Sequence, residues 1–161
     1  MNTIAWRWHW PRHNVELLVT ETVAQVLSAH RQRIWETERG GQLFVDPDDP
    51  RGLVLAGATP PHPADRAGWA WLELDAKRCQ QEIGHANSQG WRLVGYWHTH
   101  PQVVPKISPV DVASFAAFAT RYTIALSSPL AVIVGKPVHP RGIRAWSIRD
   151  GQPKEGEPAP A

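Results

Sequence analysis

The chain has 161 residues, of which 42% are hydrophobic, with a formal net charge of +2 and a sequence pI near 9.0. This length and composition predict one globular domain with a sizeable core, and so mild a charge gives no argument for nucleic-acid binding. No apolar run approaches the roughly 20 residues of a membrane span, and the first residues lack the apolar core of a signal peptide. The single cysteine, Cys79, excludes an internal disulfide. We therefore expect a cytoplasmic protein without a membrane partner.

The N-terminal segment carries Trp6, Trp8 and Trp10 at a period of two among basic residues. This pattern indicates either an edge strand packed on the domain or an exposed interaction patch, and we favour the packed strand. A short strand is predicted over residues 14–20. Apolar residues at helical spacing then predict a helix over residues 20–34.

A charged turn with Glu36 and Glu38 follows and opens into a strand. Strands are predicted at residues 43–45, 52–59 and 69–74, and a helix that Asp75 can cap is predicted over residues 75–88. The connection between the second and third of these strands contains prolines and a histidine and is expected to be a loop.

The most informative stretch is residues 91–111. An apolar run predicts a buried strand that leads into His98 and His100 and ends at Pro101. On a strand, positions i and i+2 face the same side, so the two imidazoles should point the same way. Ser108 then precedes a proline and, three residues on, Asp111, which is the signature of a helix start. Two neutral nitrogens and one carboxylate, brought together on rigid elements, make a three-ligand zinc site with an open fourth position.

After the helix that starts at Ser108 and runs to Tyr122, strands are predicted at residues 130–134 and 143–148. Residues 151–161 are polar, with proline and glycine, and predict a disordered tail. We therefore expect a single α/β domain over residues 1–150.

Each part of the central motif has an ordinary explanation when it stands alone. A histidine pair usually binds nothing, Ser108 with Asp111 is most simply a capping box, and Glu38 is most simply a solvated turn residue. The combination of His-x-His, seven residues, Ser, two residues and Asp is long, and chance rarely supplies it. It resembles the motif of the JAMM/MPN+ (Mov34/MPN/PAD-1) metallopeptidases at every defining position.

By that resemblance, His98, His100 and Asp111 are the ligands of one catalytic zinc ion, and Ser108 hydrogen-bonds near the scissile carbonyl. The family also places a glutamate in a Glu-x-x-Gly pattern before an apolar strand, and Glu38 fits this pattern because Gly41 follows it. Glu38 would then be the general base. Glu36 fails the spacing, and Val45 stands where many family members have a second glycine.

The resemblance covers roughly residues 14–149 and implies the MPN fold, a cytidine-deaminase-like curved mixed β-sheet flanked by helices. It implies a zinc-dependent isopeptidase that cleaves after the C-terminal glycine of a ubiquitin-like protein. The chain looks most like the bacterial Prok-JAB branch, whose members often accompany E1- and E2-like enzymes in conjugation or anti-phage systems. A ubiquitin-like protein or its conjugates, and E1- and E2-like proteins, are the partners that this implies.

Two other functions remain open. One is a catalytically silent MPN scaffold, against which the complete set of ligands argues. The other is a small-molecule amidase or sulfur-carrier processing hydrolase on the same site, since the loops around a groove decide the substrate. Residues 58–67 and 101–107, both with prolines, are the segments that we expect to wall a narrow slot for the substrate's terminal glycine.

Overall fold

The structure is a computed structural model that describes residues 2–33, 35–122, 128–136 and 142–161. Its N-terminal elements are β1 (Ile4–Trp10), the 3₁₀ turn η1 (Pro11–His13), β2 (Val15–Thr20), α1 (Glu21–Ala29), β3 (Gly40–Asp46), β4 (Val54–Ala58), β5 (Arg66–Ala67) and β6 (Leu72–Glu73). They are followed by α2 (Ala76–Ser88), β7 (Arg92–Thr99), α3 (Pro109–Tyr122), β8 (Leu130–Val134), β9 (Ile143–Arg149), β10 (Gln152–Glu155) and β11 (Glu157–Pro160).

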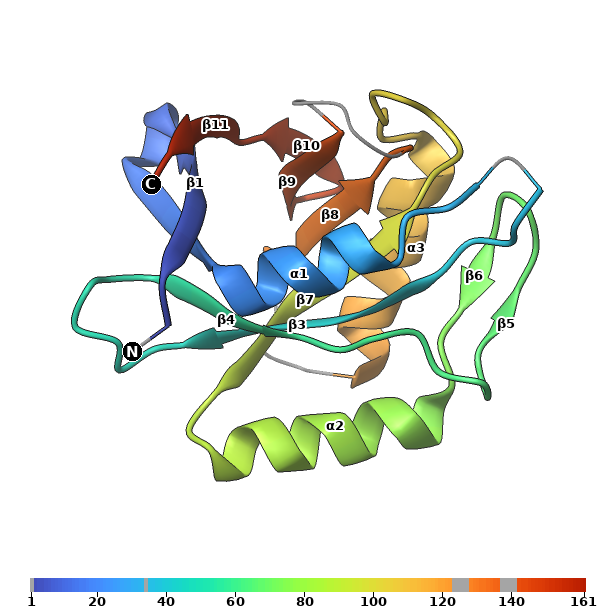
Figure 1. The fold of residues 1–161 in the computed structure, drawn as a ribbon, viewed down its shortest axis with the longest axis horizontal. Helices are drawn as coiled ribbons and strands as arrows, with labels where there is room; N and C mark the ends of the chain where they lie inside the picture. The colour runs from blue at the N-terminus through green and yellow to red at the C-terminus, as the bar shows by residue number, and fades with distance from the viewer. Residues whose placement is uncertain (1, 34, 123–127, 137–141) are drawn as a thin grey trace.

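Within the described ranges, nine strands form one curved sheet in the order β10-β9-β8-β7-β3-β4-β2-β1-β11 (Figure 1). The sheet is mixed, because β2 with β4 and β7 with β8 are parallel pairs while the other neighbours are antiparallel. Parallel neighbours need a long crossover, and α3 supplies it between β7 and β8. This confirms the predicted α/β class, a mixed sheet flanked by helices.

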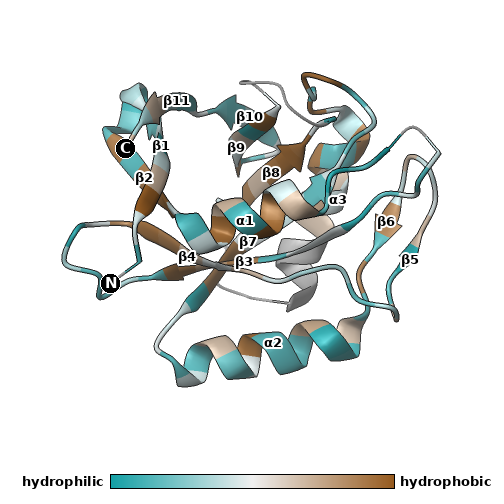
Figure 2. Cartoon of the chain, in the orientation of Figure 1, coloured by the Kyte–Doolittle hydropathy of each residue, from teal (hydrophilic) through white to brown (hydrophobic). Residues whose placement is uncertain are grey.

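The core has two parts, one on each face of the sheet. Val23 and Leu27 of α1 pack on one face with residues such as Trp8 and Trp97. On the other face, α2 and α3 contribute Cys79, Ala86 and Phe115 to a second cluster. Figure 2 shows the central strands as largely hydrophobic and the outer side of α2 as hydrophilic, which is the pattern of a two-sided core with solvated helix backs.

The tryptophan-rich N-terminus is a packed strand, as favoured from its sequence. Trp8 is fully buried and Trp10 is 8% exposed. The strand is not at the edge of the sheet, however, since β1 lies between β2 and β11. The described part of the chain contains no helix that is long and apolar enough to cross a membrane.

The prediction of a disordered C-terminal tail, which is based on composition, is wrong. Residues Gln152–Glu155 pair with β9, and residues Glu157–Pro160 pair with β1 at the other end of the sheet, with only Gly156 between the two strands. The turn from β9 into β10 uses Asp150 and Gly151 at φ 51° and 70°, the left-handed conformation of a two-residue hairpin. Backbone pairing, which composition does not record, orders this polar segment.

Two predicted elements are shorter than expected. The helix α1 ends at Ala29, and residue 34, the predicted end, lies outside the described residues. The predicted strand over residues 69–74 is reduced to Leu72–Glu73, which pairs with Arg66–Ala67 in a separate small hairpin. Trp69 and Trp71, in the turn of that hairpin, are 56% and 52% exposed, so the apolar residues there do not mark a buried strand.

Candidate metal centre

The two histidines lie at the carboxyl end of β7, where neighbouring strands hold the chain on both sides. His98 is paired with Gly40 of β3 and with Ile133 of β8. Its ring stacks on Phe115 of α3 with centroids 5.0 Å apart, so the second core cluster supports the ring. The Nε2 atoms of His98 and His100 are 3.0 Å apart, which agrees with two side chains on the same face of one strand.

Asp111 reaches the histidines from the first turn of α3. Its Oδ2 accepts hydrogen bonds from the backbone N and the Oγ of Ser108, at 2.7 and 2.8 Å, and its own backbone N donates to Ser108 Oγ at 3.1 Å. This is the reciprocal bonding of a capping box. Its other oxygen, Oδ1, lies 3.3 Å from Nε2 of both His98 and His100. The capping box therefore orients the carboxylate toward the histidines.

The spacing of these three atoms suits a tetrahedral metal ion. Ligand bonds of about 2.0–2.1 Å place the corners of a tetrahedron about 3.3–3.4 Å apart, and the observed separations are 3.0, 3.3 and 3.3 Å. Burial, with the nearby charge of His100, lowers the pKa of His98, although Asp111 opposes this, so His98 is in the neutral form that binds metals. His98, His100 and Asp111 are thus a group that could hold a metal ion.

His100 and Asp111 are coupled electrostatically. Burial lowers the pKa of His100, but the hydrogen bond to Asp111 and the charges of Asp111 and Glu38 outweigh it and raise the pKa. Burial raises the pKa of Asp111, yet its hydrogen bonds with His100, His98 and Ser108 hold the pKa well below its usual range. Asp111 is therefore a carboxylate at neutral pH, as a metal ligand must be.

Glu38 is the acid that enters this site, whereas Glu36 does not. Glu38 is 6% exposed, and its Oε1 lies 3.9 Å from Nε2 of His100. Burial raises the pKa of Glu38 to about 7; the charge of Asp111 adds to this rise and that of His100 opposes it. Glu36 accepts a hydrogen bond from the backbone of Arg33 and forms an ion pair with Arg39 at 3.4 Å.

Gly41, three residues after Glu38, occupies a position that has no room for a side chain. A Cβ built at Gly41 would lie 2.0 Å from the carbonyl oxygen of Thr59 and 2.8 Å from Nε1 of Trp97. The segment after β4 therefore passes too close to β3 for any residue but glycine. This gives a local structural reason for a glycine at that distance from the acid.

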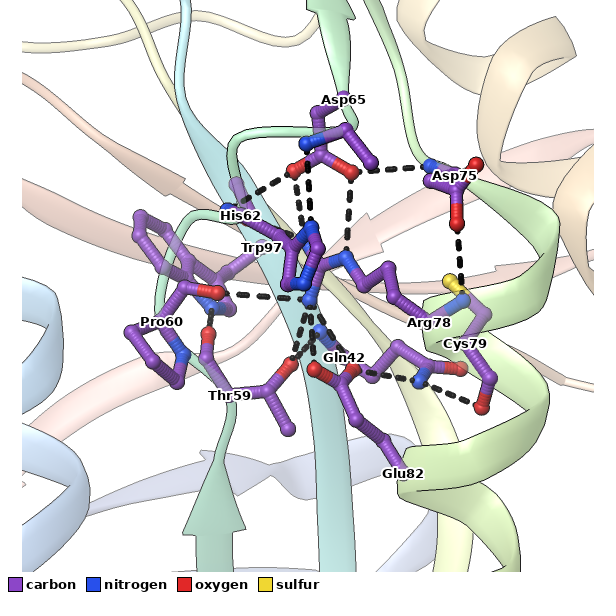
Figure 3. Close-up of polar contacts among 12 residues, drawn as sticks. Gln42, Thr59, Pro60, His62, Asp65, Asp75, Arg78, Cys79, Glu82 and Trp97 are labelled. Carbon is purple, nitrogen blue, oxygen red and sulfur yellow. Dashed lines mark hydrogen bonds and ion pairs between the residues drawn. The ribbon is translucent and has the colours of Figure 1, made fainter.

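The start of β3 is held by a buried arginine, Arg78, that the sequence did not single out. Figure 3 shows its contacts with Asp65, Glu82 and Thr59. Arg78 of α2 is 2% exposed and donates to the carbonyl oxygen of Gly40 at 2.9 Å. It also forms ion pairs with Asp65 at 2.8 Å and with Glu82 at 2.9 Å, and a hydrogen bond to Thr59. The network therefore joins α2, the loop before β5 and the strand that follows Glu38. The only sequence signal was the i, i+4 spacing of Arg78 and Glu82.

A second buried contact fixes the end of β7 between the two histidines. The side chain of Thr99 is fully buried and accepts a hydrogen bond from the backbone N of Arg39 at 3.0 Å. It donates to Gln32 at 3.0 Å, and Gln32 in turn donates to the carbonyl oxygens of Glu36 and Trp69. The segment that carries Glu38 is thereby tied to the strand that carries the histidines.

A small cavity adjoins the metal centre. Its volume is about 60 Å³, and Glu38, His98 and Asp111 form its polar side. Its apolar side is formed by residues 70–72 and Leu74 around the β5–β6 hairpin and by Val110 and Phe115 of α3. The segments predicted to wall a slot, residues 58–67 and 101–107, do not line it. The side chain of Trp71, half exposed, forms part of its wall.

Comparisons with known proteins agree with this architecture. A family model described as prokaryotic homologs of the JAB domain (Prok-JAB) matches residues 20–149. No curated protein matches the chain. The solution structure of protein DSY2949 from Desulfitobacterium hafniense is similar, with a TM-score of 0.60 at 18% identity, and the match covers 86% of this chain and 88% of that one. At that identity the likeness shows a shared fold alone.

Proposed function

The chain belongs to the Prok-JAB family, the prokaryotic homologs of the JAB domain, and we propose that it is a zinc-dependent peptidase or isopeptidase. The observation that carries this proposal is the spacing of the three candidate ligand atoms, with Glu38 buried beside them. An intact ligand set with a buried acid at its side argues against the silent scaffold, for which neither would be needed.

The residues suggest a hydrolytic mechanism without an acyl-enzyme intermediate. His98, His100 and Asp111 would hold one zinc ion, which when bound supplies an acidified water and a Lewis acid for the carbonyl. Glu38, with its pKa raised to about 7, suits a group that takes a proton from water and passes it to the leaving amine. Ser108 keeps Asp111 oriented, and we assign its hydroxyl a second role as a donor to the carbonyl oxygen of the substrate. Because the hydroxyl has a single proton, this donation would replace its hydrogen bond to Asp111 Oδ2, which would keep the bond from the backbone N of Ser108.

The substrate that we propose is a ubiquitin-like protein, or its conjugate, cut after the terminal glycine. The cavity of about 60 Å³ beside the candidate ligands is small, which favours a small residue over a large side chain next to the metal centre. The family resemblance extends the proposal to the cytoplasm and to a bacterial conjugation or anti-phage system with E1- and E2-like partners. These assignments rest on the family, and the cavity supports only the demand for a small residue.

The direct test is cleavage of a ubiquitin-like protein that ends in two glycines and is fused to a reporter. The zinc-loaded chain should release the reporter, while 1,10-phenanthroline and the substitution His98→Ala should each abolish release. Hydrolysis of small glycyl amides without cleavage of the fusion would instead favour the small-molecule amidase. Binding of the fusion without any hydrolysis would favour the scaffold.

A further inference from the structure

A second, larger cavity lies away from the metal centre. Its volume is about 270 Å³, close to the lower end of the roughly 300–1,000 Å³ range of ligand pockets. It includes Val94, four residues before His98 along β7, which corresponds to a separation of about 13 Å. Leu17, Val45 and Leu130 in its wall belong to the core cluster of the α1 face, whereas the ring of His98 packs on the opposite face. We refer to this cavity as the distal pocket.

The wall of the distal pocket is apolar and comes from many strands. It is formed by Trp10, Val15, Leu17, Val45, Leu53, Val94 and Leu130. Val15 and Leu53 are 38% and 42% exposed, so part of this apolar wall is open to solvent. The binding of an aliphatic group that displaces water from such a wall is therefore favourable in free energy.

The tryptophan in this wall is held in place before any ligand binds. Trp10 Nε1 donates to the carbonyl oxygen of Lys154 at 2.8 Å. Gly156 lies so close to the indole that a Cβ there would be 2.7 Å from the ring. The C-terminal strands therefore fix the Trp10 ring, and a preformed wall lowers the ordering cost of binding.

The rim of the distal pocket is basic. His13, Arg149 and Lys154 line it together with Ser128 and Ser147, and no acidic side chain of the described residues does. Arg149 Nε donates to Ser128 Oγ at 3.2 Å, and its two terminal nitrogens have no partner among the described residues. None of the three basic side chains forms an ion pair within the described part of the chain. An apolar wall with a basic rim matches a molecule that has an aliphatic chain and an anionic head.

We propose that the distal pocket binds a medium-chain fatty acid, with its chain along the Leu17–Val45–Leu130 wall and its carboxylate at Arg149 and Lys154. A planar guanidinium with free N–H groups can bind a carboxylate in a bidentate geometry. A single compact cavity of about 270 Å³ suits one aliphatic chain, whereas an amphipathic protein segment would need a longer groove with several apolar subsites. This site is independent of the proposed peptidase activity.

Isothermal titration of the delipidated full-length chain with decanoate, below its micellar concentration, tests the proposal. We expect saturable binding of one decanoate per chain, with or without zinc. Decanol, which has the same chain and no charge, should bind about tenfold more weakly, and Arg149→Gln should weaken decanoate binding by about the same factor. Arg66→Gln, which removes an exposed arginine of β5, is the matched control and should have no effect.

A second pair of variants tests the location. Leu53→Glu places a negative charge at the mouth and should abolish decanoate binding, while Val103→Glu, at a site 48% exposed and outside the pocket, should not. Circular dichroism checks that both variants are folded. Equal affinities for decanoate and decanol, decanoate binding that needs zinc, or binding unaffected by Leu53→Glu would each overturn the proposal. So would co-sedimentation with anionic vesicles in the absence of decanoate binding, which would identify a membrane surface as the occupant.

Discussion

Ser108 and Asp111 hold each other through three hydrogen bonds in the first turn of α3, and these bonds leave Asp111 Oδ1 facing the two histidines. Ser108 thus acts both on the helix and on the candidate metal ligand. Replacing a residue that orients a metal ligand in this way typically lowers metal affinity by about 10- to 100-fold. The same serine is the N-cap, so its loss also destabilises the helix.

We therefore predict that Ser108→Ala lowers zinc affinity by about 10- to 100-fold and stability by about 0.5–2 kcal/mol. Competition with a chromogenic chelator measures the first effect, and urea denaturation of the zinc-free protein measures the second. If zinc affinity is unchanged while turnover falls, Ser108 acts on the substrate alone and not through Asp111.

The second prediction concerns the metal itself. The wild-type chain should bind one zinc ion, with nitrogen ligands at about 2.0–2.1 Å and a carboxylate oxygen at about 2.0–2.2 Å by X-ray absorption. His98→Ala should lose both the zinc and the activity. His85→Ala is the control, since His85 is exposed on α2 and lies outside the candidate metal group. Full zinc occupancy in His98→Ala would contradict the ligand assignment.

The third prediction separates the two acids of the turn before β3. Glu38→Gln keeps the shape of the side chain but cannot accept a proton, so turnover should fall by about 10²- to 10⁴-fold while zinc content and folding are retained. Glu36→Gln should remain active, because Glu36 pairs with Arg39 and not with His100. Steady-state cleavage of the reporter fusion, with zinc measured in each sample, checks both. The reverse result would mean that Glu36 is the base.

The fourth prediction concerns the buried network around Arg78. Arg78→Met leaves Asp65 and Glu82 without their cation and the carbonyl of Gly40 without its donor, and should lower stability by about 3–5 kcal/mol. The control is Arg7→Met, because Arg7 pairs with Glu16 at 3.7 Å on the surface and its loss should change stability by less than about 1 kcal/mol. Denaturant midpoints of the two variants test this. Similar midpoints would show that the network contributes nothing.

The relation between sequence and structure differs from one part of the site to another. The mutual orientation of His98 and His100, and the capping box of Ser108 and Asp111, follow from rules that act over a few residues, so the sequence could predict them. Arg78 binds the carbonyl of Gly40, which is 38 residues away, and no local pattern indicates such a contact. Buried polar residues of this kind are found only once the fold brings distant segments together.

The C-terminal segment shows an error of a different kind. Asp150-Gly151 is a strong signal for a two-residue hairpin turn, and it follows the strand β9 directly. The polar composition of residues 151–161 instead predicts disorder, but backbone hydrogen bonds do not depend on composition. The hairpin between residues 66 and 73 departs from the prediction for the opposite reason, since Trp69 and Trp71 give an exposed turn the composition of a buried strand.

The fifth prediction concerns the residue that precedes the cut. The cavity beside Glu38, His98 and Asp111 has a volume of about 60 Å³, so it should accept a terminal glycine and exclude leucine. Replacing the substrate's terminal glycine by leucine should lower kcat/KM by about two orders of magnitude, since the pocket rejects each excess methylene group, and should leave zinc content unchanged.

Trp71 makes this test specific, because it lines the cavity while the neighbouring Trp69 does not. Trp71→Ala should enlarge the cavity and raise the leucine-to-glycine ratio of kcat/KM. Trp69→Ala removes an indole of similar exposure and should leave that ratio as it is in the wild type. If the wild-type enzyme cleaves glycine- and leucine-ended substrates at equal rates, the cavity does not select the substrate. A ratio that rises equally in both variants would mean that the hairpin as a whole, and not the wall formed by Trp71, restricts access to the metal centre.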